Sequence, residues 1–286
     1  MKILLLGGSG QLGWEIRQRA FDLNFELHSP VKSEVNISDA AQLKFLAKEL
    51  KPEVIVNCAA YTAVDKAESE PDRAFLINRD GAINAAEAAN QVGARLIHIS
   101  TDYVFDGAVA AARAEDDPTG PLNVYGASKL AGEQAIAAAG IPHLIFRTSW
   151  VYGMRGKNFL LTMLRLARER DELRVVADQH GAPTWSRTIA DVTAQVLAQA
   201  HAGGREWWVQ NRGVYHLTAQ GQTTWYDFTR AILAEAGLNC RVVPITSAEY
   251  PVPARRPEHS VLSSEKLMAR FCHLPEWQHA LQLCMR

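Results

Sequence analysis

Cysteine is scarce in this 286-residue chain, and the spacing of the few cysteines excludes two classes of protein. Cys58, Cys240, Cys272 and Cys284 form no Cys-x-x-Cys pair, so they indicate neither a disulfide framework nor a cysteine-based metal site. Sparse and unpaired cysteines are typical of proteins in a reducing compartment. We therefore expect a cytoplasmic protein.

Long hydrophobic runs, an excess of charge and metal-ligand spacings are also missing. No stretch approaches the length of a membrane span, and the apolar run at residues 3–6 is too short for the core of a signal peptide. The formal net charge of -1 provides no basic surface for nucleic acid or an anionic membrane. The nine histidines show no His-x-His or His-Glu-x-x-His spacing, which argues against a catalytic metal.

What the chain does contain at its start is a strand, a glycine-rich turn and a helix. Residues 2–6 are mostly apolar and suit a strand buried on both faces of a parallel sheet. The turn that follows carries Gly7, Gly8, Gly10 and Gly13, and an amphipathic stretch covers residues 11–23. Such a turn lets the backbone approach a pyrophosphate, which then lies at the helix N-terminus. This context predicts a dinucleotide-binding site.

The second apolar segment, residues 25–28, bears on the choice of cofactor. NAD-specific enzymes usually place an acidic residue near this point to bind the ribose 2′-hydroxyl group. After His28 this chain has Ser29 and Lys32 instead, and no acidic residue until Glu34. A serine and a lysine suit a 2′-phosphate. We therefore expect NADPH as the cofactor, with NADH as the alternative.

The alternation of strands and helices continues to residue 150 and predicts a doubly wound α/β domain with a Rossmann-type parallel sheet. Residues 54–57 and 95–99 are the next apolar strands, and residues 73–91 form an alanine-rich helix that contains Asn78. Small residues follow the first of these strands, and a Ser100-Thr101-Asp102 run follows the second. The carboxyl ends of parallel strands are where such folds bind ligands.

Tyr125 and Lys129 are the residues on which the functional prediction depends. They lie four apart and so share one face of a helix. Of the seven tyrosines, only Tyr125 has a lysine at the fourth position after it. A nearby ammonium group favours the phenolate and lowers the pKa of a tyrosine. The pair alone is equally compatible with a solvated lysine beside a buried aromatic ring.

Taken together, these motifs resemble the extended short-chain dehydrogenase/reductase family. Within it, the chain is most similar to the members that reduce the C4 ketone of a dTDP-linked deoxysugar. The runs that carry the resemblance are Gly7-x-x-Gly10-x-x-Gly13, residues 57–60, Asn78, residues 62–68, residues 100–105, Tyr125 with Lys129, residues 147–152, residues 178–184 and Arg256-Pro257.

The resemblance implies a role for each residue of the site. Tyr125 is the proton donor, Lys129 holds the nicotinamide ribose and lowers the pKa of the tyrosine, and Thr101 completes the catalytic triad. Asp102 and Trp150, together with Thr101, contact the deoxysugar. The residues implied to bind the cofactor are Gly7, Gly10, Gln11, Leu12, Gly13, His28, Asn36, Ile37, Ala59, Ala60, Tyr61, Thr62, Tyr125 and Lys129.

Two positions of this chain concern the nucleotide and a metal ion. Arg256 is a candidate partner for the nucleotide diphosphate, because a guanidinium stays charged and binds phosphate in a fork. Some members of the family are dimers bridged by magnesium, and Glu15 is a weak candidate ligand. At the position of the second ligand, however, this chain has Arg187 in a Trp185-Ser186-Arg187 run. We therefore expect no metal, and a monomer or a metal-independent homo-oligomer.

After residue 150 the regular alternation weakens. We expect residues 151–286 to form mainly a second, smaller domain that binds the sugar nucleotide, and we expect the chain to return to the first domain around residues 174–200. Helices are predicted at residues 158–170 and 188–200, and strands at residues 173–177 and 214–218. The tryptophans of this half, except Trp150, are expected to be core or rim residues.

Two alternatives to a sugar-nucleotide reductase stay open. An epimerase or a 4,6-dehydratase uses the same fold, although dehydratases carry an acidic pair after the threonine and here Asp102 is followed by Tyr103. The other alternative is a non-catalytic regulatory subunit, as in the beta subunit of methionine adenosyltransferase, which resembles these reductases. An intact set of Thr101, Tyr125 and Lys129 argues against the second alternative.

Overall fold

The computed structural model describes residues 1–23 and 25–286, and its centre is a six-stranded sheet. The strand order is β2-β1-β3-β4-β5-β10, and every neighbouring pair is parallel. The strand order changes direction at β1. The segments that follow β1 and β3 therefore leave the sheet towards opposite faces, which opens a crevice at the carboxyl ends of these two strands. The strands are β1 (Lys2–Leu6), β2 (Glu26–His28), β3 (Val54–Asn57), β4 (Arg95–Thr101), β5 (His143–Thr148) and β10 (Gly213–His216).

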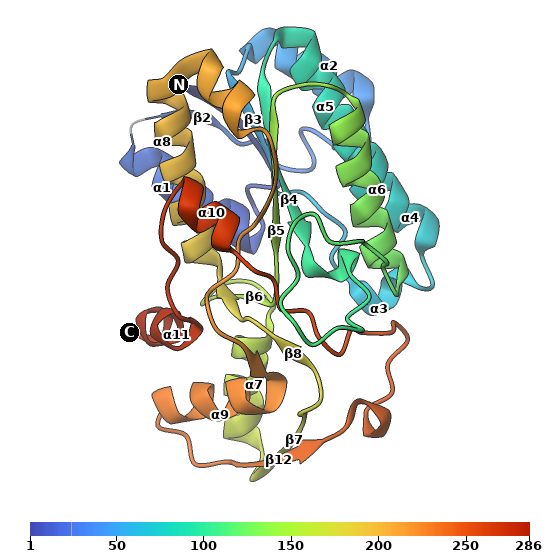
Figure 1. Cartoon of the computed structure of the whole chain (residues 1–286), viewed down its shortest axis with the longest axis vertical. Coiled ribbons are helices and arrows are strands. Elements are labelled where there is room, and N and C mark those ends of the chain that lie inside the picture. The colour runs from blue at the N-terminus through green and yellow to red at the C-terminus, as the bar shows by residue number, and fades with distance from the viewer. Residues whose placement is uncertain (24) are drawn as a thin grey trace.

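Helices cover both faces of this sheet (Figure 1). Ile3 and Leu5 of β1 point into one core cluster, which α1, α8 and α10 close, whereas Leu4 and Leu6 point into the other, which α2, α5 and α6 close. This alternation explains why the strand reads as a continuous apolar run. The helices are α1 (Gln11–Asp22), α2 (Ala40–Leu50), α5 (Gly81–Val92), α6 (Val124–Ala138), α8 (Ser186–Asn211) and α10 (Glu265–Arg270).

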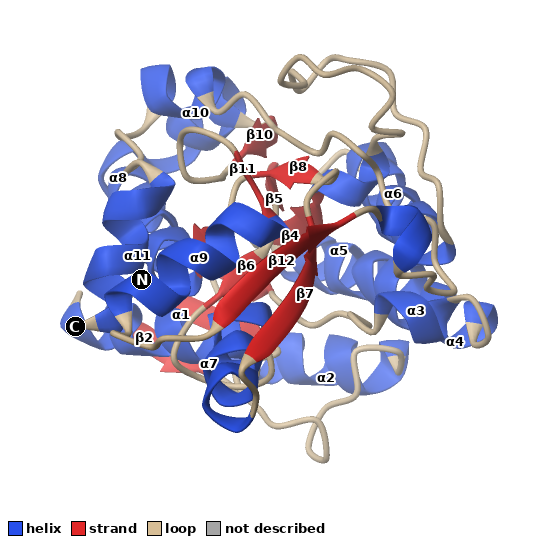
Figure 2. Ribbon diagram, turned by 90° about the horizontal axis from the view of Figure 1, so that it is seen from below, coloured by secondary structure: helices blue, strands red, loops and turns tan. Residues whose placement is uncertain are grey.

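A smaller unit lies beyond the carboxyl end of the large sheet. Its core cluster contains Phe228 and Trp277, and its longest strand pair is β7 with β12, which lie side by side in Figure 2. The elements of this unit are β6 (Val151–Tyr152), α7 (Phe159–Glu169), β7 (Glu172–Val176), β8 (His180–Gly181), β9 (Thr184–Trp185), β11 (Thr223–Thr224), α9 (Trp225–Glu235), β12 (Arg241–Ile245) and α11 (Trp277–Met285).

The second half of the chain crosses between the two units. β7 pairs with β12 in the smaller unit, and the chain returns to the large sheet over α8 and β10. The division at residue 150 stays a prediction. Within residues 1–23 and 25–286, no helix has both the length and the apolar character that a membrane crossing requires.

The helix expected over residues 73–91 is present, but its hydrogen-bonding pattern changes along its length. α4 (Pro71–Phe75) passes into a π-helical turn at Leu76–Asp80 before α5 begins. The buried side chain of Asn78 lies in this turn and binds both the N–H and the carbonyl group of Tyr61, at 2.8 and 3.1 Å. Its amide also donates to Ser128 of α6 at 2.9 Å. Such π turns are frequent at functional sites, and this one connects α6 to the strand end after β3.

Candidate active site

A pocket of about 240 Å³ opens at the carboxyl ends of β1 and β3, where the strand order reverses. Gly7 has φ +80°, and a Cβ atom there would lie 2.6 Å from the backbone nitrogen of Ala59. Only glycine therefore lets the two strand ends approach this closely. The pocket is lined by Leu6, Gly7, Ser9, Gly10, Pro30, Lys32, Val35, Asn36, Ile37, Cys58, Ala59, Ala60 and Ile77.

The residues around this pocket fit a dinucleotide. A Cβ atom at Gly13 would collide with the backbone of Gly7 and Gly8, so the start of α1 can pack this closely on the glycine turn only with glycine at position 13. The amide nitrogen of Gln11 and the hydroxyl group of Ser29 are buried and have no hydrogen-bond partner among the described residues. Buried polar atoms without partners are costly unless a ligand or water binds them. Both lie on segments next to the glycine turn.

Helix α6 brings Tyr125 and Lys129 to the same end of the sheet. The side chain of Asn123 caps the helix by accepting from the backbone nitrogen of Gly126 at 2.8 Å. Gly126 lies against the backbone carbonyl of Tyr103, and a Cβ atom would not fit between them. α6 therefore packs closely on the segment that follows Thr101, the last residue of β4.

The amine of Lys129 is buried, with only 2% of the residue exposed. It donates to the carbonyl oxygen of Ile99 at 2.6 Å and lies 3.2 Å from Nε2 of His98. Burial lowers the pKa of Lys129 to about 8, although Glu133 and Cys58 oppose the shift. Cys58 also lines the pocket, so the amine lies next to the predicted cofactor site.

In the protein without a cofactor, Lys129 is not among the groups that shift the pKa of Tyr125, and its predicted lowering of that pKa stays a prediction for the complex. The amine of Lys129 contacts Ile99 and His98 on β4. Burial raises the pKa of Tyr125 to about 12, against a smaller lowering by the hydroxyl group of Thr101, and Asp102 raises it further. The phenol is therefore kept protonated, in the form that can donate a proton.

Thr101 and Asp102 form the polar wall opposite the phenol. The hydroxyl group of Thr101 donates to Oδ1 of Asp102 at 3.0 Å. Burial raises the pKa of Asp102 to about 7, and the nearby hydroxyl group of Ser260 opposes this rise. Oδ2 of Asp102 and the Ser260 oxygen still lack a good hydrogen-bond partner among the described residues. These two atoms are therefore available to a ligand.

Trp150 lies in a strained and tightly enclosed position. Its φ of +47° is in the left-handed region, which non-glycine residues rarely adopt. Its ring stacks on Trp225, with centroids 3.5 Å apart and planes 8° apart. A Cβ atom at Gly181 would collide with the Trp150 ring, so the glycine makes room for it. Strain of this kind is concentrated at ligand sites.

Arg256 reaches the site from the proline-rich loop near the C-terminus. One of its Nη atoms donates to Oδ2 of Asp65 at 2.8 Å, and the other is buried without a partner among the described residues. The loop is fixed nearby, because the side chain of Asn123 donates to the carbonyl oxygen of Arg255 at 2.8 Å. The free end of the guanidinium is thus held close to the start of α6.

Comparisons with known proteins identify the family. The model of the family described as RmlD substrate binding domain matches residues 1–286. A dTDP-4-dehydrorhamnose reductase of Burkholderia thailandensis is 48% identical over 298 residues, which cover 100% of this chain and 98% of the relative. The chain belongs to the family of the dTDP-4-dehydrorhamnose reductases. The predicted resemblance is confirmed.

Solved structures of this reductase family have the same fold. The dTDP-4-dehydrorhamnose reductase of Clostridium acetobutylicum superposes with a TM-score of 0.93 at 39% identity, covering 100% of this chain and 98% of that one. The Bacillus anthracis reductase in complex with NADP superposes with a TM-score of 0.91 at 36% identity, covering 99% of each chain. The doubly wound Rossmann-type fold predicted from the sequence is confirmed.

Only part of the predicted cofactor set of this reductase lines the pocket. Gly7, Gly10, Asn36, Ile37, Ala59 and Ala60 do so. Leu12 packs against a core cluster, His28 pairs with Glu26 at 3.0 Å, and the Tyr61 hydroxyl group donates to Glu70 at 2.9 Å. Gln11 accepts from Asn158 at 2.9 Å, and Thr62 is exposed. The roles of these residues in binding stay predictions.

Other residues of the site were missed from the sequence. Pro30, Val35 and Ile77 line the pocket without belonging to any motif, whereas Ser9 lines it from a non-glycine position inside the glycine turn. Trp225 was expected to be structural, yet it stacks on Trp150, which comes 75 positions earlier in the chain. No local spacing signals such a contact, because it depends on how α9 packs against the strand end after β5.

The candidate metal ligand Glu15 has a protein partner. Its Oε2 atom lies 3.2 Å from Nε of Arg187, and only 8% of the glutamate side chain is exposed. Among the described residues, no cluster of three or more His, Cys, Asp or Glu side chains is arranged to hold a metal ion. The guanidinium thus neutralises this carboxylate, while the absence of a bound metal stays a prediction.

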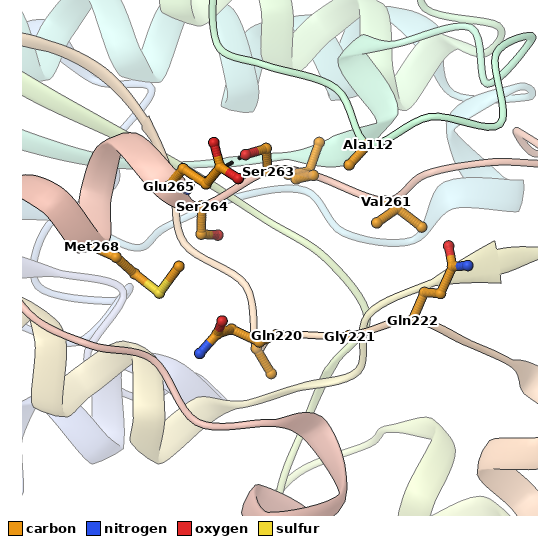
Figure 3. Close-up of a pocket in the computed structure, with 11 residues that line it drawn as sticks. Ala112, Gln220, Gly221, Gln222, Val261, Ser263, Ser264, Glu265 and Met268 are labelled. Atoms are coloured by element: carbon orange, nitrogen blue, oxygen red, sulfur yellow. Dashed lines mark hydrogen bonds between the residues drawn. The ribbon is translucent and has the colours of Figure 1, made fainter.

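A second hollow, of about 330 Å³, lies between the loop at residues 219–222 and the segment at residues 261–268 (Figure 3). Gln220 and Gln222 border one side, and Ser263 and Glu265 border the other, where Glu265 donates its backbone N–H to Ser263 at 3.5 Å. None of the residues predicted to act in the site borders this hollow.

Proposed function

We propose that this protein reduces the C4 ketone of dTDP-4-dehydro-L-rhamnose to dTDP-L-rhamnose, using NADPH. One observation carries the proposal: a pocket of about 240 Å³ opens at the sheet's switch point, and Cys58 in its lining lies close enough to the amine of Lys129 to affect its pKa. The helix of Lys129 also carries Tyr125, whose phenol lies beside the hydroxyl group of Thr101. The family supports the choice of substrate, because a relative that is 48% identical over the whole chain is named dTDP-4-dehydrorhamnose reductase. The protein is thus an oxidoreductase of nucleotide sugars.

In this mechanism Tyr125 is the general acid. Its phenol, whose pKa burial holds above the usual value, donates a proton to the oxygen of the substrate's C4 carbonyl. The hydroxyl group of Thr101 lies beside the phenol and orients the same carbonyl oxygen. When bound, NADPH supplies the hydride. Lys129 is placed to hold the ribose of the bound dinucleotide. Thr101 and Lys129 are buried and Tyr125 is half-buried, which limits the access of water to the reacting atoms.

Cofactor choice follows from the loop after β2. Lys32 lines the pocket, and the partnerless hydroxyl group of Ser29 lies next to Gly8. We propose that these two residues bind the 2′-phosphate of NADPH. The Bacillus anthracis reductase at 36% identity, in complex with NADP, supports this choice, and NADH is the weaker alternative.

The sugar nucleotide is proposed to bind between the two units. Asp102 accepts hydrogen bonds from sugar hydroxyl groups through its free Oδ2 atom, and Trp150 covers one face of the deoxysugar. Arg256 binds the diphosphate with the Nη atom that has no protein partner. Binding across two units fixes the orientation of the reacting atoms.

Replacing Arg256 by glutamine is expected to raise the Michaelis constant for the sugar nucleotide by about 10- to 100-fold, because one charge-assisted hydrogen bond to phosphate contributes about 1.5–3 kcal/mol. The turnover number should change much less, since the residue does not contact the reacting carbonyl. Steady-state kinetics with saturating NADPH measure both constants. Arg255→Gln is the matched control, because this neighbouring side chain is exposed. Equal effects of the two substitutions would remove Arg256 from the phosphate site.

The proposed reaction is tested by adding dTDP-4-dehydrorhamnose to the purified protein and following NADPH absorbance. Oxidation of NADPH that depends on the sugar nucleotide, with dTDP-L-rhamnose as the product, is the expected result. An epimerase would retain bound NAD through purification and interconvert sugars without net oxidation of NADPH. A regulatory subunit would bind the dinucleotide and turn over no sugar. Either of the last two outcomes would overturn the proposal.

The cysteines and the Glu15 ion pair bear on location and assembly. The described cysteines are all free, which suits the reducing cytoplasm predicted from the sequence. A monomer or a metal-independent homo-oligomer remains the expected assembly, supported by the ion pair of Glu15 with Arg187.

A further inference from the structure

The buried amide of Asn57, at the end of β3, has a fixed orientation. Its Oδ1 atom accepts from the backbone nitrogen of Ala59 at 3.0 Å, and a backbone N–H can only donate. The Nδ2 end of the amide therefore faces the ring of His98 on β4, where it lies 3.1 Å from Nδ1. A flipped amide would place two donors against each other at Ala59.

This amide also fixes the tautomer of His98. Because Asn57 donates to Nδ1, that ring nitrogen accepts and carries no proton. Burial lowers the pKa of His98 well below its usual value, and the charge of Lys129 lowers it further. The ring is therefore neutral and carries its one proton on Nε2. That N–H points at the amine of Lys129, 3.2 Å away.

Such a contact suits only one protonation state of Lys129. An ammonium group has three donors and no acceptor, so it cannot accept from the Nε2–H of His98. A neutral amine has a lone pair for that bond and two N–H groups, one of which donates to the carbonyl oxygen of Ile99 at 2.6 Å. When the lysine is neutral, each contact in this buried series of hydrogen bonds joins a donor to an acceptor.

We propose that, at alkaline pH, the Asn57–His98 pair holds Lys129 as a neutral amine in the cofactor-free protein, and that binding of the dinucleotide then draws the amine away from His98 with uptake of one proton. The ribose hydroxyl oxygens of the cofactor accept from an ammonium group, which His98 cannot do. His98 is thus a positioning residue that acts through Lys129. The inference rests on the dinucleotide-binding part of the proposed function, and not on the identity of the sugar.

The groups that face Lys129 do not exchange protons in the same pH range. Burial raises the pKa of the Cys58 thiol and of the Tyr125 phenol to about 12 each. The carboxylate of Glu133, one turn along α6, is paired with the guanidinium of Arg147 at 2.7 Å. Proton uptake above about pH 8 is therefore assigned to Lys129.

Calorimetric titration of the protein with NADPH, in buffers of different ionisation enthalpy, counts the protons taken up. Since the amine is neutral in the free protein above its pKa of about 8 and charged in the complex, binding takes up a proton there. At about pH 9 we expect uptake close to one proton, and a dissociation constant that rises by up to about tenfold per pH unit. Below about pH 7 both effects should vanish, because the lysine is then protonated in both states.

His98→Gln is the diagnostic variant. The glutamine carbonyl can accept from an ammonium group, so the free protein would keep Lys129 charged, and the proton uptake at about pH 9 should fall at least threefold. NADPH should still bind. His143→Gln is the matched control, since His143 is also buried on the sheet and contacts the carbonyl oxygen of Ile141. It should keep the uptake of the parent protein.

Nitrogen NMR of the unchanged, cofactor-free protein tests the same inference if the variant does not fold. The expected signature is a His98 ring protonated on Nε2 and not on Nδ1. A proton on Nδ1, or pH-independent NADPH binding without proton uptake, would overturn the inference. A protein that binds NADPH with proton uptake but reduces no sugar would instead contradict only the proposed substrate.

Discussion

Tyr125→Phe is expected to lower the turnover number by about 10²- to 10⁴-fold, which is the usual contribution of a positioned general acid. This corresponds to about 3–5 kcal/mol of transition-state stabilisation. Burial raises the pKa of this phenol to about 12, so it is protonated at working pH, and the hydroxyl group of Thr101 lies beside it. Phenylalanine keeps the ring and its edge-on contact with Tyr103, so the site should keep its shape. Turnover is measured with saturating NADPH and sugar nucleotide.

Two further phenylalanine substitutions make this result specific. Tyr103 lies with its ring centroid 5.9 Å from that of Tyr125, so it is the other phenol that could be considered as donor. Burial raises the pKa of Tyr103 as well, so the pKa values do not choose between the two phenols; the hydroxyl group of Thr101 beside Tyr125 does. Tyr215→Phe is a control for the loss of a buried hydroxyl group far from the pocket. If Tyr103→Phe lost more turnover than Tyr125→Phe, Tyr103 would be the proton donor and the assignment to Tyr125 would be wrong. NADPH affinity should stay within about twofold in all three variants.

The parts of the fold that the sequence predicts are those with local causes. The glycine turn follows from Gly7 and Gly13, where a side chain would strike backbone atoms within a few residues or at the adjacent strand end. The shared face of Tyr125 and Lys129 follows from helical spacing and from the cap at Asn123. The alternation of strands with helices predicts the parallel sheet, because βα units bury both faces of each strand.

What the sequence does not predict depends on contacts between distant segments. The π-helical turn at Leu76–Asp80 is stabilised by the bonds that Asn78 makes to Tyr61 and Ser128, and helix propensity alone favours a regular helix there. The amine of Lys129 on helix α6 contacts His98 on strand β4, so residue spacing along α6 cannot reveal this contact.

Glu133→Gln is expected to destabilise the fold by about 3–5 kcal/mol, because it leaves the charge of Arg147 buried and unpaired. Each side chain of the pair is 5% exposed, and the shortest contact is 2.7 Å. The guanidinium donates through two of its nitrogens to both oxygens of the carboxylate, and Ser100 donates to it as well. Arg147 also lies over the ring of Phe105, at 5.1 Å from its centroid. Urea unfolding monitored by tryptophan fluorescence measures the loss.

A substitution in an exposed ion pair and a double substitution of the buried pair serve as controls for Glu133→Gln. Glu169→Gln removes the partner of Arg165 on the surface of α7, where the two side chains are 52% and 60% exposed, and it should leave the unfolding midpoint unchanged within error. Replacing Glu133 and Arg147 together by leucine removes both buried charges, so this variant should be more stable than Glu133→Gln. If Glu133→Gln instead shifts the midpoint no more than Glu169→Gln does, water must reach the guanidinium between β4 and β5, and the pair contributes as little as a surface ion pair.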